Sequence, residues 1–440
     1  MGLPTVHGSA MAFVVVLAAC GTSEPPGNPT EPADVTPSLH VTAKEVVIHV
    51  DDDAAPGGNG SGRFPYRNLP EALAAAHAIA ATVVIKVEPG DYAIAEPLVI
   101  ERSVDLRGST QQVESDDPWP TGEVSAGTRT RIYATNPLGS YSLVVVGRGY
   151  GHVLTGVRIS GFVFEGTAAG TEVLLTRVQD YWVANNVFRA PSTFALVSIA
   201  SSGHVTGNHF SGAGTGAIFN GGYPASPSTV VFTGNRSVRN NLGGVLLNGA
   251  SINIPELGDE LNAIVRDNDL SDNTFSPTAG FGLRVFIQRR DLDAPGNSQS
   301  SARVHALVQD NRVDGNRIGI SIDAGFPYRR VGTVCDTRVY SGEIDLTLAG
   351  NTVTGSLLTP GLVTFTRNSA ALTPSTLPQW QYLHAATFVI ADRDGTLADA
   401  MIDHPASDPF LGPCPGDASH EQLQNALIYN GVELLNGRNF

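Results

Sequence analysis

The chain has 440 residues, of which 42% are hydrophobic and 16% are charged, and it contains 48 glycines and 28 prolines. This composition excludes a long disordered protein and a coiled coil, because both need more charge and less apolar content. The net charge of −15 at pH 7 repels phosphate groups, so we expect no nucleic-acid partner. The remaining class is a turn-rich, mostly β protein, and stacked repeats can use this length as one unit.

Segment 1–20 has the features of a lipoprotein signal peptide. Residues 12–19 form an apolar run that is too short to span a bilayer but suits the central region of a secretion signal. The run ends in Leu17-Ala18-Ala19-Cys20, which resembles a bacterial lipobox with Cys20 as the lipidated residue. Residues 1–11 contain no Lys or Arg, where such signals are normally basic, so the true start of the signal stays open. A buried apolar strand is the alternative interpretation.

Residues 21–44 are rich in Pro, Thr and Glu and are expected to tether a lipid anchor to a folded domain. Gly21 follows the cysteine, which by resemblance to lipoprotein sorting rules favours the outer membrane. We therefore expect an exported protein that contacts the membrane through its lipid alone.

Export also places Cys335 and Cys414 in an oxidising compartment, where a pair forms a disulfide more often than a metal site. Two separate buried thiols are the alternative.

One phrase recurs between about residues 170 and 370: a short apolar strand and a small or acidic residue precede an asparagine, and a strand that starts with glycine follows. Stacked coils place such strands about 4.8 Å apart and let identical polar residues bond along the stack. The asparagines are therefore expected to form an internal ladder at a turn. They are Asn186, Asn208, Asn235, Asn268, Asn311 and Asn351.

The chain resembles the right-handed parallel β-helix, or pectin-lyase-like, family of exported bacterial proteins. The resemblance extends from about residue 45 to 370 and includes the opening phrases Val50-Asp51-Asp52-Asp53, Gly57-Gly58-Asn59-Gly60 and Val87-Glu88-Pro89-Gly90-Asp91-Tyr92. It implies an all-β fold, a single-stranded right-handed parallel β-helix (solenoid) with an N-terminal capping helix.

The expected domains follow from these features. The solenoid covers 45–383, and Asn68 caps a helix over 68–81 that closes its N-terminal end. Residues 384–440 contain no further copy of the asparagine phrase and are expected to form a C-terminal cap, with a second helix over 419–429.

Most insertions fall between a glycine-led strand and the next asparagine-bearing strand, at 221–228, 249–261, 288–302, 324–341 and 367–385. Insertions at one point of a repeat emerge on one side of the stack and build a shared wall. Its aromatics, arginines and carboxylates suit a sugar chain, while solvated loop charges are the alternative. The candidate ligand-binding residues are Tyr223, Asp291, Tyr328, Arg329, Arg330 and Trp380.

Two sets of residues are candidates for catalysis. Asp267 and Asp310 precede ladder asparagines and can stack on adjacent coils, where an inverting hydrolase needs two carboxylates; turn-stabilising aspartates are the other interpretation. A lyase would use Arg289-Arg290 or Arg329-Arg330 as the base, with Ca²⁺ to neutralise a uronate. The Asn-Thr-Asp and Gly-His-Gly phrases of polygalacturonases and the Trp-Ile-Asp-His phrase of pectate lyases are absent from the sequence.

Asp51, Asp52 and Asp53 form a candidate Ca²⁺ site on a glycine-rich loop, with an acidic turn as the alternative. The sequence predicts a lipoprotein that recognises a polysaccharide or another cell-envelope component through the wall of insertions. A polysaccharide lyase or hydrolase acting in the same groove and a structural spacer without ligand are the alternatives. The ligand's identity, a catalytic role and the oligomeric state stay open.

Overall fold

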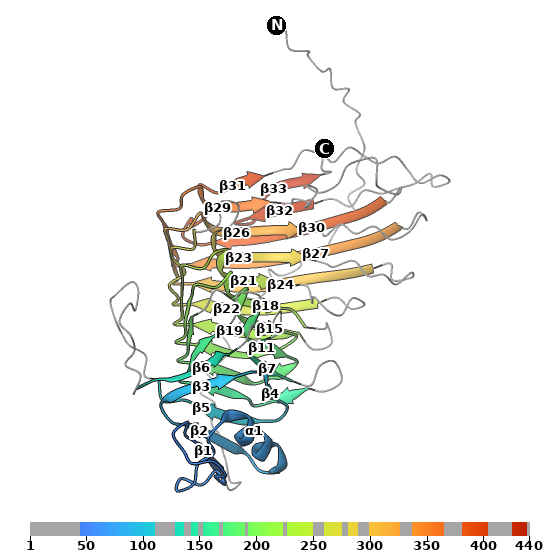
Figure 1. Cartoon of the computed structure of the whole chain (residues 1–440). Coiled ribbons are helices and arrows are strands. Elements are labelled where there is room, and N and C mark those ends of the chain that lie inside the picture. Colours follow the sequence, from blue (N-terminus) through green and yellow to red (C-terminus); the bar gives the residue numbers. More distant parts are fainter. Residues whose placement is uncertain are drawn as a thin grey trace, which may run out of the picture. The chain divides into compact units, whose positions relative to one another are not determined.

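The structure, a computed structural model, is built of parallel strands stacked coil upon coil. It describes residues 45–110, 128–135, 142–147, 153–166, 170–189, 192–222, 227–249, 259–274, 280–288, 299–325, 337–364, 381–403 and 425–437, all within the compact unit Val41–Phe440. Coils follow one another from β1 at the base to β31 at the top of Figure 1. This arrangement confirms the predicted all-β parallel solenoid.

Sheet I is the longest sheet, with 13 strands that are parallel from β1 to β32 and antiparallel between β32 and β33. Its strands are β1 (Val46–Val50), β2 (Val83–Val87), β5 (Val104–Arg107), β9 (Arg158–Ser160), β13 (Tyr181–Ala184), β16 (Gly203–Thr206), β19 (Ser228–Thr233), β22 (Asp259–Arg266), β24 (Gln299–Gln309), β27 (Thr337–Ala349), β30 (Gln381–Asp392), β32 (Asn425–Tyr429) and β33 (Val432–Gly437).

Sheets II and III complete the coils. Sheet II contains β3 (Gly90–Ile94), β6 (Thr130–Ala134), β10 (Val163–Glu165), β14 (Val187–Arg189), β17 (His209–Ser211) and β20 (Arg236–Val238). Sheet III contains β4 (Leu98–Ile100), β7 (Val144–Val146), β11 (Thr171–Thr176), β15 (Phe194–Ile199), β18 (Thr215–Asn220), β21 (Gly243–Asn248), β23 (Phe281–Gln288), β26 (Ile318–Gly325), β29 (Thr359–Thr364) and β31 (Met401–Asp403). Two short pairs join β8 (Leu154–Thr155) to β12 (Val178–Gln179) and β25 (Arg312–Asp314) to β28 (Thr352–Thr354).

The helix α1 (Leu69–Ala78) covers the first coil, as predicted, and lies beside β1 and β2 in Figure 1. The Oδ1 of Asn68 accepts a hydrogen bond from the backbone N–H of Glu71 at 2.9 Å, which satisfies one of the free donors of the first turn. The helix ends at Ala78 because Ile79 is extended, three residues earlier than expected. Among the described residues, no helix is long and apolar enough to cross a membrane.

Aligned apolar side chains fill the interior. Phe164, Phe188 and Phe210 occupy the same register position on three consecutive coils, with ring centroids 5.2 and 4.7 Å apart. All three are fully buried. Such stacked pairs contribute about 0.5–1.5 kcal/mol beyond their buried area, so they favour one register of each coil on the next.

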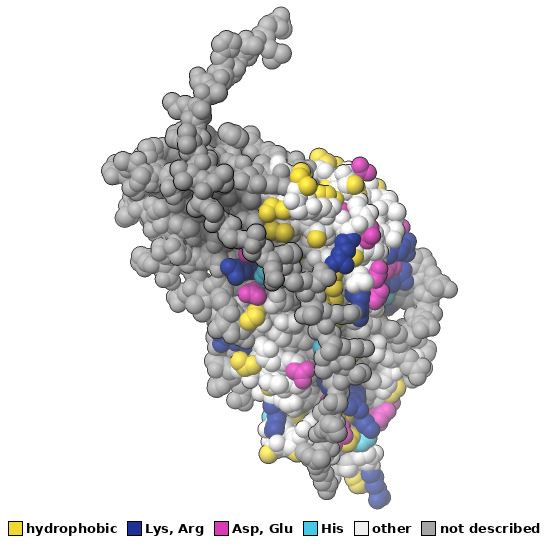
Figure 2. All heavy atoms as spheres, turned by 180° about the vertical axis from the view of Figure 1, so that it is seen from behind, with side chains coloured by type: hydrophobic (Ala, Val, Ile, Leu, Met, Phe, Trp, Pro, Cys, Tyr) yellow, Lys and Arg dark blue, Asp and Glu magenta, His cyan; other side chains and the backbone are white. Residues whose placement is uncertain are grey.

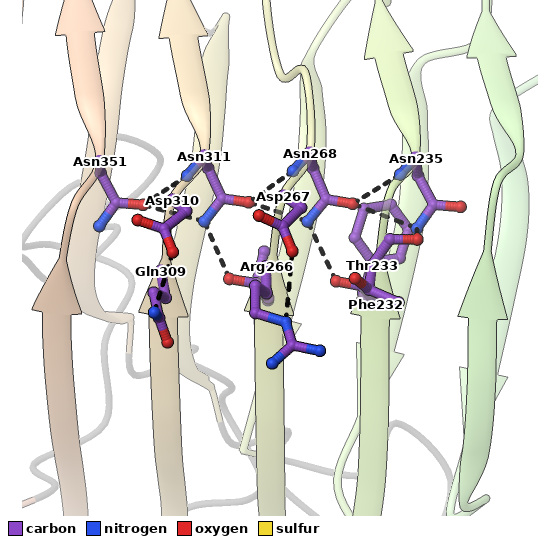
Figure 3. A network of polar contacts seen from close by, with 11 residues as sticks. Phe232, Thr233, Asn235, Arg266, Asp267, Asn268, Gln309, Asp310, Asn311 and Asn351 are labelled. Carbon is purple, nitrogen blue, oxygen red and sulfur yellow. Dashed lines mark hydrogen bonds and ion pairs between the residues drawn. The ribbon is translucent and has the colours of Figure 1, made fainter. Parts of the chain in front are cut away.

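The predicted asparagine ladder is present and joins successive coils (Figure 3). The Oδ1 of Asn268 accepts from the backbone N–H of Asn235 at 2.9 Å and from its Nδ2 at 3.2 Å. The Nδ2 of Asn268 donates to the carbonyl of Phe232 at 3.0 Å and to the Oδ1 of Asn311 at 2.8 Å. The same pattern repeats along the ladder, so each amide satisfies buried backbone groups on the turn.

A second ladder, which the sequence analysis did not identify, runs parallel to the first. Its members Asn240, Asn273 and Asn316 are fully buried and bond in the same way, with 2.9 Å from the N–H of Asn240 to the Oδ1 of Asn273. Glycines in sheet III make room for it, since a Cβ added at Gly244 would lie 3.2 Å from the Nδ2 of Asn273. Gly244 of β21 therefore has a packing role, because a side chain at this position would crowd the second ladder.

The C-terminal region differs from the expectation of a helix over 419–429. Of residues 419–429, the structure describes Asn425–Tyr429, which form the strand β32. Ala426–Tyr429 of β32 pair with Thr387–Ile390 of β30 in parallel register. A short apolar run does not distinguish helix from strand, and here the open edge of sheet I provides the pairing that selects the strand. β30 also crosses the predicted solenoid boundary at 383/384, so coil geometry continues to Asp392.

We predict that Asn186→Ala lowers the free energy of unfolding by about 1–3 kcal/mol, because it removes the hydrogen-bond partner of the N–H of Phe162 and one hydrogen bond to the C=O of Ile159. The exposed neighbour Asn185 provides a matched control, because its φ of 55° suits glycine. Asn185→Gly should change stability by less than about 1 kcal/mol. Urea unfolding followed by circular dichroism measures both, and equal effects would contradict the ladder's role.

A buried carboxyl group lies at the edge of β11. Glu172 is fully buried, and its Oε1 accepts from the Oγ of Ser192 at 3.3 Å. Burial raises the pKa of Glu172 well above its usual value, which favours the protonated acid in the folded state.

This burial predicts a pH-dependent stability. Because the folded chain holds the Glu172 proton that the unfolded chain releases above about pH 4.3, stability should fall as pH rises from that value, by up to about 1.4 kcal/mol per unit. Glu172→Gln should remove that decline, whereas Glu96→Gln at an exposed position should retain it. Urea midpoints measured across this pH range test it, and an unchanged slope in Glu172→Gln would contradict it.

Candidate functional site

The outer face of sheet I carries a group of polar side chains on three neighbouring strands, β22, β24 and β27. On β22, β24 and β27 alternate residues such as Leu261, Val304 and Ile344 are buried in the core, so the residues between them point outward. The outward residues align across the strands in three rows. These rows are Glu260, Arg303 and Glu343; Asn262, His305 and Asp345; and Ile264, Leu307 and Thr347.

The first two rows form what we call the acid–imidazole cluster: Glu260, Asn262, Arg303, His305, Glu343 and Asp345. Within it, the Nε of Arg303 lies 3.5 Å from the Oε2 of Glu343. The Nδ1 of His305 lies 3.6 Å from the Oδ2 of Asp345. These four side chains stay between about a third and a half exposed, which leaves their polar atoms accessible to a ligand.

The backbone holds this cluster rigidly. Gly222 and Glu260 form an antiparallel bridge, with hydrogen bonds of 3.1 and 2.8 Å between their backbones. From there β22, β24 and β27 pair in continuous parallel register. Neighbouring side chains of one row are consequently about 4.8 Å apart at their Cα atoms.

His305 carries an altered pKa. Its interaction with the Asp345 carboxylate raises the pKa of His305, and the charges of Glu260 and Glu343 act in the same direction, while partial burial opposes them. The imidazole therefore keeps its proton to higher pH than a free histidine does. A protonated imidazole beside a carboxylate can donate a hydrogen bond to a ligand or serve as a general acid.

A strip of apolar side chains borders the acid–imidazole cluster. Val231, Ile264 and Leu307 align on three consecutive strands of the same face, and each is only partly buried. Such a strip beside charged groups matches a sugar ring, which has an apolar face and a rim of hydroxyls.

Towards the N-terminal end of the same face, Trp182 stacks on His204 with centroids 4.7 Å apart, and the guanidinium of Arg158 lies 6.0 Å from the Trp182 ring centre. Because neighbours from the adjacent coils cover both ring faces, this stack presents ring edges outward. We assign it a structural role.

The wall of insertions predicted from the sequence lies largely outside the described residues. This applies to all candidate ligand-binding and lyase residues, namely Tyr223, Arg289, Arg290, Asp291, Tyr328, Arg329, Arg330 and Trp380. The strands that follow the insertions are described, and β24, β27 and β30 extend beyond their neighbours to one side in Figure 1. The acid–imidazole cluster lies near the start of β22 and in the middle of β24 and β27.

Asp267 and Asp310 lie on adjacent coils, as expected, beside the asparagine ladder (Figure 3). Their φ angles of 56° and 52° are left-handed, and glycines 207, 234 and 350 occupy the equivalent position in other coils. The Oδ2 of Asp310 accepts from the side chain of Gln309 at 2.9 Å, and that of Asp267 lies 3.3 Å from the Nε of Arg266. This geometry agrees with turn-stabilising aspartates, while a catalytic role for them stays a prediction.

Asp51, Asp52 and Asp53 bring carboxylate oxygens within 4.8 Å of one another. The Oδ2 of Asp52 accepts from the backbone N–H of Asp91 at 2.8 Å, and the Oδ1 of Asp51 accepts from that of Asp53 at 3.0 Å. These bonds fit the acidic-turn interpretation, and Ca²⁺ binding stays a prediction. Cys20, Cys335 and Cys414 lie outside the described residues, as do segments 1–20 and 21–44.

The outer face of sheet II carries charges that are mostly paired. Arg131 donates to Glu165 at 2.8 Å. Beyond the last strand of this sheet, Arg312 of β25 lies 2.9 Å from Asp314. Burial and nearby arginines lower the pKa of His209 to about 4, so this histidine is neutral. On the face shown in Figure 2, basic and acidic side chains also lie next to one another.

No known family matches this chain, and no curated protein matches it. Among solved structures, ORF18 of Geobacillus virus E2 is 12% identical, with a TM-score of 0.39, over 78% of this chain and 62% of that one. The DFA-IIIase of Arthrobacter chlorophenolicus A6 in complex with GF2 is 14% identical, with a TM-score of 0.41, over 81% of this chain and 91% of that one. The gp42 tailspike of Acinetobacter phage vb_AbaP_AS12 is 12% identical, with a TM-score of 0.37, over 82% and 60%. The chain thus spans less than two thirds of both viral proteins.

We predict that Asp267→Gly and Asp310→Gly each change the free energy of unfolding by less than about 1 kcal/mol, because glycine adopts the left-handed φ of this turn. Asp267→Val should destabilise the chain by more than this, since a β-branched residue is strained there. Thermal unfolding compares the three variants. A large loss of stability in both glycine variants would show that the aspartate side chains stabilise the fold by contacts that glycine cannot make.

Proposed function

We propose that this protein binds a polysaccharide along the outer face of sheet I, over β22, β24 and β27. The observation that carries the proposal is the acid–imidazole cluster beside an apolar strip, fixed in register by three paired strands. Charged groups bond sugar hydroxyls strongly, and the strip contacts the apolar faces of the rings. A solenoid offers these groups along a line, which suits a linear polymer.

Hydrolysis on the same face is a second candidate, favoured by one specific feature. Glu260 and Glu343 flank Arg303 at the same register position, so their Cα atoms are two strand spacings, about 9.6 Å, apart. An inverting glycosidase needs two carboxyl groups on opposite sides of the bond that it cleaves, and Glu260 and Glu343 are the candidate pair on this face. His305 would then assist by donating a hydrogen bond to the sugar.

The site of action that the sequence predicts is the cell envelope. We include it in the proposal: segment 1–20 directs export, Cys20 carries the lipid, and 21–44 tethers the solenoid at the outer membrane. Cys20→Ser should abolish incorporation of radiolabelled palmitate and release the protein from the membrane fraction. Continued labelling of that variant would contradict the anchor.

The proposed groove can be tested by electrophoresis of the protein through gels that contain soluble polysaccharides. We predict that Arg303→Ala weakens retention by about tenfold, equivalent to about 1.4 kcal/mol, because it removes a charge-assisted contact. Arg312 of β25, outside sheet I, has a similarly exposed guanidinium, so Arg312→Ala should leave retention unchanged.

The same polymers, assayed for new reducing ends, distinguish binding from hydrolysis. New ends that disappear in Glu260→Gln and in Glu343→Gln would establish the hydrolase. Absence of retention on every polymer would contradict the proposed function and favour a spacer.

A further inference from the structure

The charge of the acid–imidazole cluster indicates which class of glycan it binds. The cluster contains three carboxylates, from Glu260, Glu343 and Asp345, but only one guanidinium and one imidazole. Its net charge is therefore −2 when His305 is neutral and −1 when it is protonated. A uronate would add negative charge to a surface that already has an excess of it.

The ion pairs leave one carboxylate available. Arg303 pairs with Glu343, and His305 pairs with Asp345. The carboxylate of Glu260 receives only the amide of Asn262, at 3.4 Å, and no cation within 4.0 Å among the described residues. Glu260 lies in the row of Arg303 and Glu343, next to the row of His305 and Asp345, so a positively charged group on a ligand would complete the charge balance there.

Resting on the proposed function, we propose that the groove selects a glycan with free amino groups, whose ammonium binds at Glu260 between β19 and β24. Ring faces then lie on Ile264 and Leu307, while Arg303 and His305 contact the hydroxyls. Each sugar residue that carries an amine contributes a contact that its N-acetylated counterpart lacks.

The test compares three soluble oligosaccharides of equal length: glucosamine, N-acetylglucosamine and galacturonate oligomers. Isothermal titration of the full chain at one pH and ionic strength should show tightest binding for the glucosamine oligomer. Added salt should weaken that binding, since the contact is electrostatic. Glu260→Gln should reduce it about fivefold, the upper range for one exposed ion pair, and leave binding of the N-acetylated oligomer unchanged.

A matched control is essential because a chain of net charge −15 attracts any polycation at long range. Glu96→Gln makes the same charge change at an exposed position outside the groove and should retain wild-type affinity. Equal losses in both variants, or tighter binding of the acetylated or galacturonate oligomer, would overturn the amino-sugar assignment while leaving polysaccharide binding intact. If none of the three oligomers binds in this titration, the amino-sugar assignment is overturned. If, in addition, no polysaccharide of the wider gel panel retains the protein, the proposed function is overturned as well.

Discussion

The repeated hydrogen bonding of buried asparagine amides from coil to coil is the interaction on which the rest of this structure depends. Each amide satisfies backbone groups that a tight turn would otherwise leave buried without partners, as Asn268 does for Asn235 and Phe232. Since the carboxamide reaches only one coil in each direction, it also fixes the register of that coil on its neighbours. A ladder of this kind favours one way of stacking and penalises slippage.

Fixed register has a direct consequence for the outer face. Once the ladder asparagines align, the residues six and eight positions before them must align as well, on the side of sheet I that faces solvent. His305 and Asp345 thus become neighbours although 40 residues separate them, and Arg303 reaches Glu343 in the same way. The site is a product of stacking, and no coil contains it alone.

The sequence predicted the solenoid, the first ladder and the capping helix, because each has a local signal: the repeated asparagine phrase, glycine-led strands and Asn68 before an alanine-rich run. The second ladder also had a signal, since Asn240, Asn273 and Asn316 each follow a first-ladder asparagine by five residues. Insertions of different lengths obscured this spacing, because they made the overall repeat irregular.

The acid–imidazole cluster was missed for a related reason. Glu260 falls within the predicted insertion 249–261. In contrast, the sequence around Arg303, His305, Glu343 and Asp345 looks like that of any other strand of the repeat. Counting back eight residues from Asn268, Asn311 and Asn351 gives Glu260, Arg303 and Glu343, and counting back six gives Asn262, His305 and Asp345. The ladder asparagines are the positions from which this count starts, so the cluster can be identified only after the register of the coils is known. The predicted C-terminal helix is wrong over Asn425–Tyr429, where the chain forms β32, because the apolar run is too short to reveal a period.

Hydroxyl-radical footprinting of the full chain, with and without the best-retained glycan, tests the central claim most directly. The account predicts that bound glycan protects His305, Leu307 and Ile264 from oxidation, while the exposed side chains of Leu357 and Leu358 stay equally reactive. Unchanged oxidation at His305 and Leu307 with saturating glycan, or protection at Leu357 and Leu358 instead, would contradict a binding groove on the outer face of sheet I.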